Sequence, residues 1–317
     1  MSLGATIAQP WTVPAAVGAA LFLWWFSTGA LFWISRLGVG RGGEGPPRPL
    51  LQRVVSGAVL CASLAALGAL AGRTAVHDAY LSFAVGLMAW AVVEYTFLTG
   101  LLTGPIARRC PPGLGGWQRF AMALGTLLWH EVAILGTGAA MLAITWQAPN
   151  QVGTWTFLLL MAMRISAKLN LFLGVPYPPA ALLPGPLAHL ESYFRVRPFT
   201  ALLPFAVTSA TALATVVAWR AATPGLDAFY ATGYALFWTL LVLGIIEHWF
   251  LILPLREAAL WSWFTGLPAR ERAGSRVKPS DLVESRGVGP SMGDPKMTAT
   301  SCANDTARPV REAAGHA

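Results

Sequence analysis

The chain has 317 residues, of which 55% are hydrophobic and only 11% are charged, and its mean hydropathy is +0.56. Soluble domains carry about a quarter charged residues, so this composition cannot supply a polar surface on every side. The formal net charge is +8, but most Lys and Arg residues lie between apolar runs or near the C-terminus. Membrane topology explains that placement, so the composition favours a membrane protein and argues against nucleic acid as a partner.

Seven apolar runs are each long enough to cross about 30 Å of hydrocarbon, which needs about 20 residues. They are continuous and do not alternate with polar residues, which favours helices over barrel strands. The sequence therefore predicts an all-α, polytopic integral membrane protein with about seven transmembrane helices. The predicted spans, in chain order, are Trp11–Ile34, Val54–Gly72, Tyr80–Thr103, Trp117–Trp146, Val152–Leu173, Thr200–Trp219 and Phe229–Leu253.

The charges between the spans predict how the chain is oriented. Arginines gather after the first, third, fifth and seventh spans, whereas the opposite side has only Arg73 and Arg220. Because cytoplasmic loops carry the excess of Lys and Arg, we expect the N-terminus outside and the C-terminus in the cytoplasm. Tryptophans then fall at the outer ends of the spans, as in an aromatic belt. These are Trp11, Trp146, Trp155 and Trp219.

Two segments differ from the spans. Residues 174–199 contain five prolines, which predict a stiff non-helical connector, followed at 187–194 by a short amphipathic helix at the membrane interface. From residue 268 onward the apolar periodicity stops, and Gly, Ser, Arg, Pro and Asp predominate. Such a segment has too little apolar area to offset its chain entropy. We therefore expect a helical bundle at 1–267 and a disordered cytoplasmic tail at 268–317.

Several ionisable residues fall inside the predicted spans, where each costs several kcal/mol unless it is paired or hydrated. From a rise of about 1.5 Å per residue, Glu94, Arg164 and Glu247 should lie on the order of 10 to 15 Å from the cytoplasmic helix ends. Lys168 should be shallower, and Glu131 should lie nearer the midplane. Arg164 and Lys168 share one helix face, so they need carboxylate partners. The charged members form a predicted intramembrane charge cluster, and two histidines accompany it. The cluster is Glu94, Glu131, Arg164, Lys168 and Glu247, and the histidines are His130 and His248.

Three acids and two bases leave one carboxylate unbalanced, which could be protonated or could hold a cation. One interpretation is structural, because buried ion pairs can fix helix register. The alternatives are a ligand or pigment-precursor site, a proton or ion pathway, or a metal-dependent enzyme that uses His130, His248 and the carboxylates. No HExxH or Glu-x-x-His motif supports the metal interpretation. Either histidine could instead ligate the magnesium of a chlorophyll-type ring, by analogy with axial ligation of haem.

Polar residues at fixed places in the apolar runs carry a resemblance to a known family. They lie in the segments 150–157 and 164–176, in Trp129-His130-Glu131 and in Leu190-Glu191-Ser192-Tyr193-Phe194. Together they resemble the photosynthetic complex assembly protein 2 family (PuhE-like) of anoxygenic phototrophic bacteria. The resemblance covers roughly residues 10–265 and excludes the predicted tail.

This resemblance implies a non-enzymatic assembly factor in a bacterial inner membrane, cytoplasmic or intracytoplasmic. It would help to build the reaction centre and its core antenna, with an influence on bacteriochlorophyll supply. The implied partners are reaction-centre or light-harvesting subunits and membrane lipid, and the implied cofactor is bacteriochlorophyll or a precursor. No catalytic or ligand residue is carried over from the family. The alternative is a membrane enzyme or transporter that acts on a tetrapyrrole or isoprenoid intermediate at the charge cluster.

Overall fold

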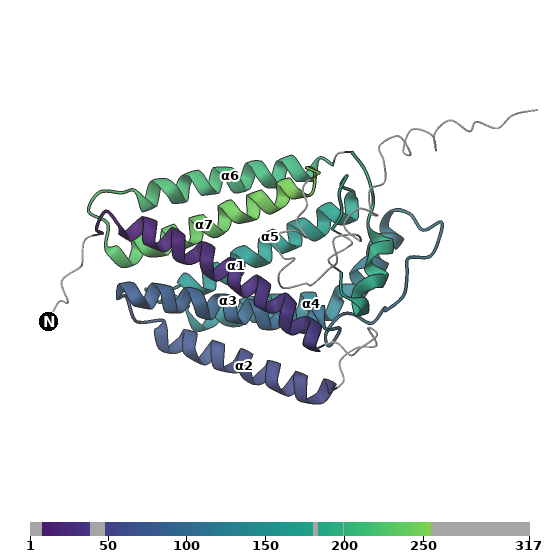
Figure 1. Cartoon of the computed structure of the whole chain (residues 1–317), viewed down its shortest axis with the longest axis horizontal. Coiled ribbons are helices and arrows are strands. Elements are labelled where there is room, and N and C mark those ends of the chain that lie inside the picture. The colour runs from purple at the N-terminus through teal and green to yellow at the C-terminus, as the bar shows by residue number, and fades with distance from the viewer. Residues whose placement is uncertain (1–7, 39–47, 180–182, 199, 255–317) are drawn as a thin grey trace, which may run out of the picture. The chain divides into compact units, whose positions relative to one another are not determined.

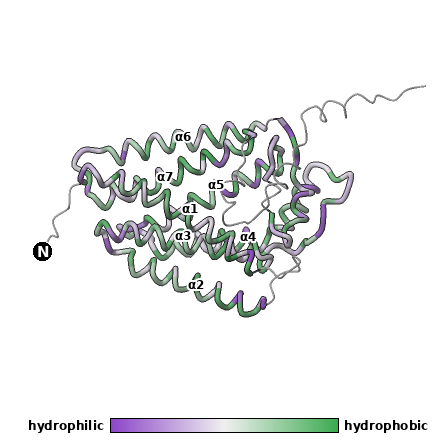
Figure 2. Tube along the Cα trace, viewed as in Figure 1, coloured by the Kyte–Doolittle hydropathy of each residue, from purple (hydrophilic) through white to green (hydrophobic). Residues whose placement is uncertain are grey.

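A computed structural model describes residues 8–38, 48–179, 183–198 and 200–254. All of the long elements in these ranges are helices (Figure 1). Seven of them are long and apolar enough to cross a membrane, which confirms the predicted all-helical fold with seven candidate spans (Figure 2). They are α1 (Thr12–Gly38), α2 (Pro49–Leu70), α3 (Val76–Leu98), α4 (Gly116–Ile144), α5 (Val152–Leu173), α6 (Leu202–Ala221) and α7 (Ala228–Phe250).

The predicted domain boundary at residue 268 and the predicted disordered tail lie outside the described residues. The membrane orientation also stays a prediction, because it rests on the loop charges alone. The tryptophans assigned to the outer ends of the spans are all exposed: Trp11 (68%), Trp146 (72%), Trp155 (50%) and Trp219 (69%).

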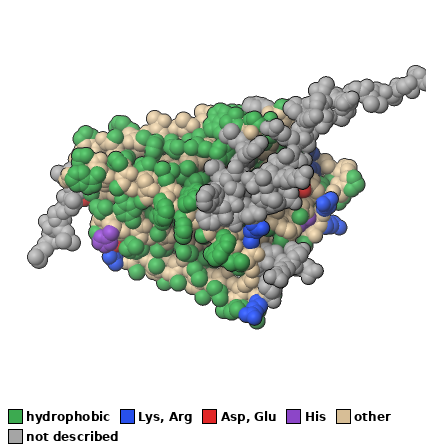
Figure 3. Space-filling model, in the orientation of Figure 1, with side chains coloured by type: hydrophobic (Ala, Val, Ile, Leu, Met, Phe, Trp, Pro, Cys, Tyr) green, Lys and Arg blue, Asp and Glu red, His purple; other side chains and the backbone are tan. Residues whose placement is uncertain are grey.

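Helices α3 and α7 form the centre of the bundle. About half of each apolar stretch is buried, whereas the other five helices bury between 17% and 28% of theirs. Helix α3 packs against α1, α2, α5 and α7, and α7 packs against α1, α5 and α6. Helix α1 crosses from the α6–α7 side of the bundle towards α3 (Figure 1). Apolar side chains cover most of the helical surface in Figure 3, as contact with lipid requires.

A close contact between α3 and α5 depends on two glycines. A Cβ atom on Gly86 would lie 2.5 Å from the Gly153 carbonyl oxygen, and a Cβ on Gly153 would lie 2.4 Å from the Ser82 carbonyl oxygen. The Ser82 hydroxyl also accepts a hydrogen bond of 2.9 Å from the Gly153 amide. Small residues allow helix backbones to approach in lipid, where no hydrophobic effect drives association. This contact fixes the register of α5 on α3, and the same two helices hold one of the ion pairs described below.

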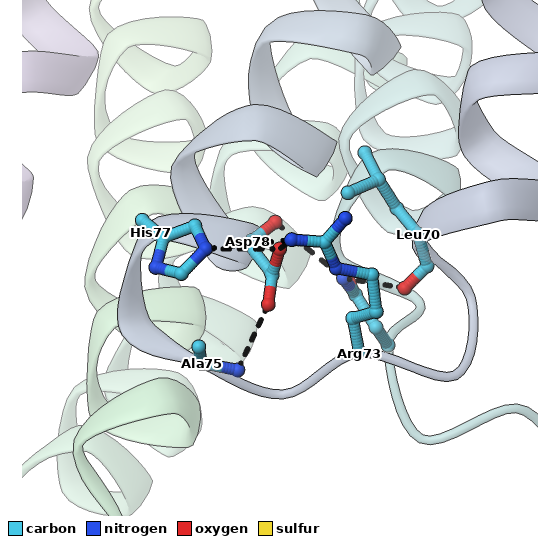
Figure 4. Close-up of polar contacts among 6 residues, drawn as sticks. Leu70, Arg73, Ala75, His77 and Asp78 are labelled. Atoms are coloured by element: carbon cyan, nitrogen blue, oxygen red, sulfur yellow. Dashed lines mark hydrogen bonds and ion pairs between the residues drawn. The ribbon is translucent and has the colours of Figure 1, made fainter.

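At the predicted outer end, Asp78 joins the turn between α2 and α3 (Figure 4). Its carboxylate lies 2.8 Å from Arg73 and 3.4 Å from the His77 ring, and accepts a hydrogen bond of 3.1 Å from the Ala75 amide at the start of α3. Asn150, from the turn before α5, donates to the carbonyl oxygens of Leu70 and Asp78. These bonds tie two turns together, and sequence reasoning assigned Arg73 only a topological role.

At the opposite end, the proline-rich connector contains the 3₁₀ helix η2 (Gly185–Tyr193), where the sequence predicted a short amphipathic helix. Its buried residues are Leu187, Leu190 and Tyr193, a spacing of three that matches the 3₁₀ period. The segment after η2 returns to α5, where the Arg195 amide donates to Leu171. The buried Arg119 side chain donates to the carbonyl oxygens of Phe172 and Tyr193. The connector and Arg119 thus satisfy the free carbonyl groups at the end of α5.

Candidate functional site

The predicted charge cluster contains two ion pairs, and both use a cation of α5. Arg164 Nη2 lies 3.1 Å from Glu94 Oε2 of α3, and Lys168 Nζ lies 2.6 Å from Glu131 Oε1 of α4. The two cations are one helical turn apart, so they reach different neighbouring helices from the same face. The structure therefore brings four of the five charged residues together in pairs, with α5 between α3 and α4.

The predicted distance to the helix end is too long for Glu94 and Glu247. Helix α3 ends at Leu98, before the predicted Thr103, and α7 ends at Phe250, before the predicted Leu253. At a rise of about 1.5 Å per residue, these carboxylates lie about 6 Å and about 5 Å from their helix ends. The chain leaves α3 because Gly100 has a φ of +77°, a left-handed conformation that favours glycine. These two carboxylates thus lie near the ends of α3 and α7, whereas their neighbour Arg164 lies well inside α5.

The segment that follows α3, residues 99–106, packs against α4. This packing explains why the sequence of the segment is apolar enough to resemble a continuation of the span. The His130 amide donates a 2.9 Å hydrogen bond to the Thr103 carbonyl oxygen. A Cβ on Gly104 would lie 2.1 Å from the Gly125 carbonyl oxygen, so only glycine permits this contact. A second backbone hydrogen bond, from the Ile106 amide to the Gly125 carbonyl oxygen, also joins this non-helical segment to α4.

A cavity of about 160 Å³ lies between α1, α3, α5 and α7, next to the Arg164–Glu94 pair. The charged residues among its described lining are Glu94, Arg164 and Glu247, and the aromatic residues are Trp24, Trp90 and Phe32. The Glu94 side chain is only 4% exposed, but that of Arg164 is 42% exposed. Glu247 is also exposed, and it faces Arg164 and accepts a hydrogen bond from Trp24 of α1. The cavity therefore has an apolar wall with charged groups at one level.

His130 is enclosed beside this cavity. Its ring is fully buried and stacks on Phe97, with ring centroids 4.2 Å apart. Nε2 lies 3.7 Å from Glu94 Oε1, beyond hydrogen-bond length, and neither ring nitrogen has a hydrogen-bond partner within the described chain. A ring covered in this way presents no nitrogen to a ligand as large as a chlorophyll macrocycle.

His248 has a partner at each ring nitrogen. Nδ1 lies 2.8 Å from the Gly244 carbonyl oxygen, and Nε2 lies 2.9 Å from the Ser166 hydroxyl. Because a carbonyl oxygen can only accept, Nδ1 carries the proton, and the neutral ring accepts the Ser166 hydrogen at Nε2. His248 therefore links α7 to α5, and this contact accounts for its burial without an added ligand.

The carboxylates and histidines do not converge on one point. In the described ranges, no three His, Cys, Asp or Glu side chains gather closely enough to hold a metal ion. The adjacent residues His130 and Glu131 face different partners, Glu94 and Lys168. The described residues therefore provide no such set of His, Cys, Asp and Glu ligands for the metal-dependent alternative.

Comparison with protein families matches residues 11–273 to the family described as "Protein of unknown function (DUF3623)". The chain belongs to this family. The match includes all seven helices and both ion pairs of this DUF3623 chain and ends within the predicted tail.

The chain is also 37% identical, over 266 residues, to the "Uncharacterized 30.4 kDa protein in puhA 5′ region" of Rhodobacter capsulatus. That alignment covers 83% of this chain and 93% of the relative. No solved structure matches the chain.

Proposed function

We propose that this protein is a non-enzymatic inner-membrane assembly factor for the photosynthetic reaction centre and its core antenna. The observation that carries the proposal is the similarity to a Rhodobacter capsulatus protein whose name places it in the puhA 5′ region. The alignment with that protein covers 93% of its length. The resemblance to the photosynthetic complex assembly protein 2 family (PuhE-like) indicates the same role. Seven spans would place the protein in the membrane where the pigment–protein complexes are built.

The geometry supports a binding role over catalysis. Four of the five cluster charges form ion pairs, and the described residues offer no metal ligand set. The cavity of about 160 Å³ is close in size to one that holds benzene, and it lies below the usual range for whole cofactors. A bacteriochlorophyll macrocycle does not fit there. An influence on bacteriochlorophyll supply would therefore act through contacts with nascent subunits or through the lipid-facing surface.

The decisive experiment is gene replacement in Rhodobacter capsulatus. Deleting the gene of the 37%-identical relative should lower the near-infrared absorbance of the reaction centre and core antenna per unit of membrane protein. Expression of this chain should restore that absorbance. A paired-charge variant such as Arg164→Ala should restore less at equal protein level, and Arg220→Ala, at the exposed end of α6, is the matched control. Unchanged absorbance in the deletion strain would rule out the assembly role.

A physical partner is tested by affinity purification of the tagged chain from mild detergent. Reaction-centre or core-antenna subunits should co-purify with the wild-type chain from cells that are assembling these complexes. Fewer of these subunits should co-purify from cells that contain only mature complexes, extracted in the same detergent. Recovery of the chain with lipid alone, under growth conditions that induce assembly, would argue that it acts without contact with the subunits.

A further inference from the structure

The cavity between α1, α3, α5 and α7 has an excess of negative charge. Its described lining contains two carboxylates, Glu94 and Glu247, and one cation, Arg164. Lys168 is outside the lining and is matched by Glu131 at 2.6 Å. Arg164 contacts Glu94 directly through one nitrogen, so its charge is shared between that carboxylate and Glu247. By formal charge, the described lining therefore contains one acidic group more than basic groups.

The side chains at this level are accessible to a ligand. Glu247 is exposed although it comes from α7, one of the two central helices, and the Arg164 side chain on α5 is 42% exposed. Glu247 lies only three residues before the end of α7, and hence about 5 Å from it along the helix. The carboxylate therefore lies within one helical turn of the C-terminal end of α7.

The chemistry of the lining selects among cations. A divalent metal needs several ligands, and no three His, Cys, Asp or Glu side chains in the described part of the chain gather closely enough to hold one. An organic ammonium needs one carboxylate, hydroxyl acceptors and aromatic surface, because aromatic faces attract cations. The cavity provides Glu247, the hydroxyls of Ser27 and Thr28, and the rings of Trp24 and Trp90.

We propose that this cavity is a binding site for a primary ammonium group, with Glu247 as its counterion and the Trp24 and Trp90 rings as its walls. Two sources provide this chemistry: the ethanolamine headgroup of an inner-leaflet phospholipid, and a small free amine. The volume of about 160 Å³ accommodates the headgroup amine with its two carbons and excludes the remainder of a lipid. The site is independent of the assembly role, because it concerns only the purified chain and its ligand.

The first test measures the thermal midpoint of the detergent-purified full-length chain by tryptophan fluorescence. Ethylammonium chloride is titrated against sodium chloride at equal ionic strength, because a ligand that binds only the folded state raises the midpoint in a saturable way. The wild-type chain should respond to ethylammonium and not to sodium. Glu247→Gln should weaken the apparent affinity about tenfold or more, the range for a hydrogen bond to a charged group. Glu191→Gln, an exposed carboxylate on η2, is the matched control and should respond like the wild type.

The second test separates the two sources. The chain is reconstituted in nanodiscs of phosphatidylethanolamine or of phosphatidylglycerol, and bound lipid is identified by native mass spectrometry. Retention of phosphatidylethanolamine that is lost in Glu247→Gln assigns the site to the headgroup. A response to ethylammonium without lipid retention assigns it to a free amine. Equal responses of wild type and Glu247→Gln, or equal effects of sodium and ethylammonium, would overturn the proposal.

Discussion

The Arg164–Glu94 pair allows a sharp prediction, because its two side chains differ in exposure. Glu94 is 4% exposed and Arg164 is 42% exposed. Removing one partner of a buried pair costs about 3–5 kcal/mol, whereas an exposed pair contributes about 0.2–1 kcal/mol. The cost thus depends on which charge is left behind. Arg164→Ala leaves the buried carboxylate and should cost about 3 kcal/mol, whereas Glu94→Gln leaves a half-exposed guanidinium and should cost about 1 kcal/mol.

The double variant Arg164→Ala/Glu94→Gln leaves neither charge and should cost about 1.5 kcal/mol, less than Arg164→Ala alone. The coupling energy is then about 2.5 kcal/mol, well above the error of about 0.5 kcal/mol expected for independent sites. Glu131→Gln gives the matched control, because Glu131 pairs with Lys168 and should not rescue Arg164→Ala.

The assay is reversible unfolding in mixed detergent–SDS micelles, followed by tryptophan fluorescence, with accumulation in membranes as a second readout. Free energies of unfolding for the wild type, the two single variants and the double variant complete the cycle. If the losses in unfolding free energy of the two single variants add up to that of the double variant, the ion pair contributes nothing to the stability of the fold. Rescue by Glu131→Gln equal to that by Glu94→Gln would mean that the pairing is different from the one described.

Three further predictions follow from other parts of the bundle. Gly86→Ala and Gly153→Ala should each cost about 1–3 kcal/mol through overpacking, whereas Gly57→Ala, with no atom within 4 Å of its added Cβ, should be neutral or stabilising in thermal unfolding. Asp78→Asn should cost about 1–2 kcal/mol, because it removes the Arg73 ion pair and weakens the start of α3; equal stability at high and low salt would contradict the ionic part. Burial lowers the pKa of His189 in η2, so the folded state favours the neutral ring. Its stability contribution is present above the unfolded pKa of about 6.5 and is lost as pH falls below it. The protection of the η2 amides, expressed relative to the intrinsic exchange rate at each pH, should therefore fall at pH 5.5, and His189→Gln should remove that dependence.

The lengths of the apolar runs predicted the seven helices well, because the thickness of the bilayer sets the same minimum length for every span. Val152–Leu173 was predicted with both ends correct, since charged or proline-containing segments adjoin it. The ends of α3 were less predictable. Residues 99–103 are apolar enough to extend the span, but Gly100 turns the chain and the segment packs on α4. Hydropathy measures transfer to lipid and cannot distinguish a lipid-facing turn of helix from a buried loop.

For the candidate site, the sequence indicated which residues carry charge but not which pairs they form. Charge neutrality required acids near Arg164 and Lys168, yet three carboxylates were available to two cations. The choice of Glu94 for Arg164 follows from the α3–α5 contact at Gly86 and Gly153, which joins positions far apart in sequence. The contact of His248 with Ser166 likewise depends on packing between α7 and α5. The sequence had offered His248 as a ligand because it could not show this partner.

Most polar residues of the charge cluster have an ion-pair or hydrogen-bond partner that explains their presence by stability, and one residue does not. Glu94, Glu131, Arg164 and Lys168 satisfy one another, and His248 is satisfied by Ser166 and Gly244, so each has a structural reason to be polar. Glu247 is different, because it adds a third carboxylate to two cations and faces a cavity instead of a dedicated cation. A bundle stabilised only by its own contacts would gain from glutamine at this position, since glutamine keeps a hydrogen-bond acceptor for Trp24 and removes the surplus charge. If Glu247→Gln proves more stable than the wild type yet no longer responds to ethylammonium, the carboxylate serves a ligand. If the variant is less stable without any ligand, Glu247 belongs to the structural network.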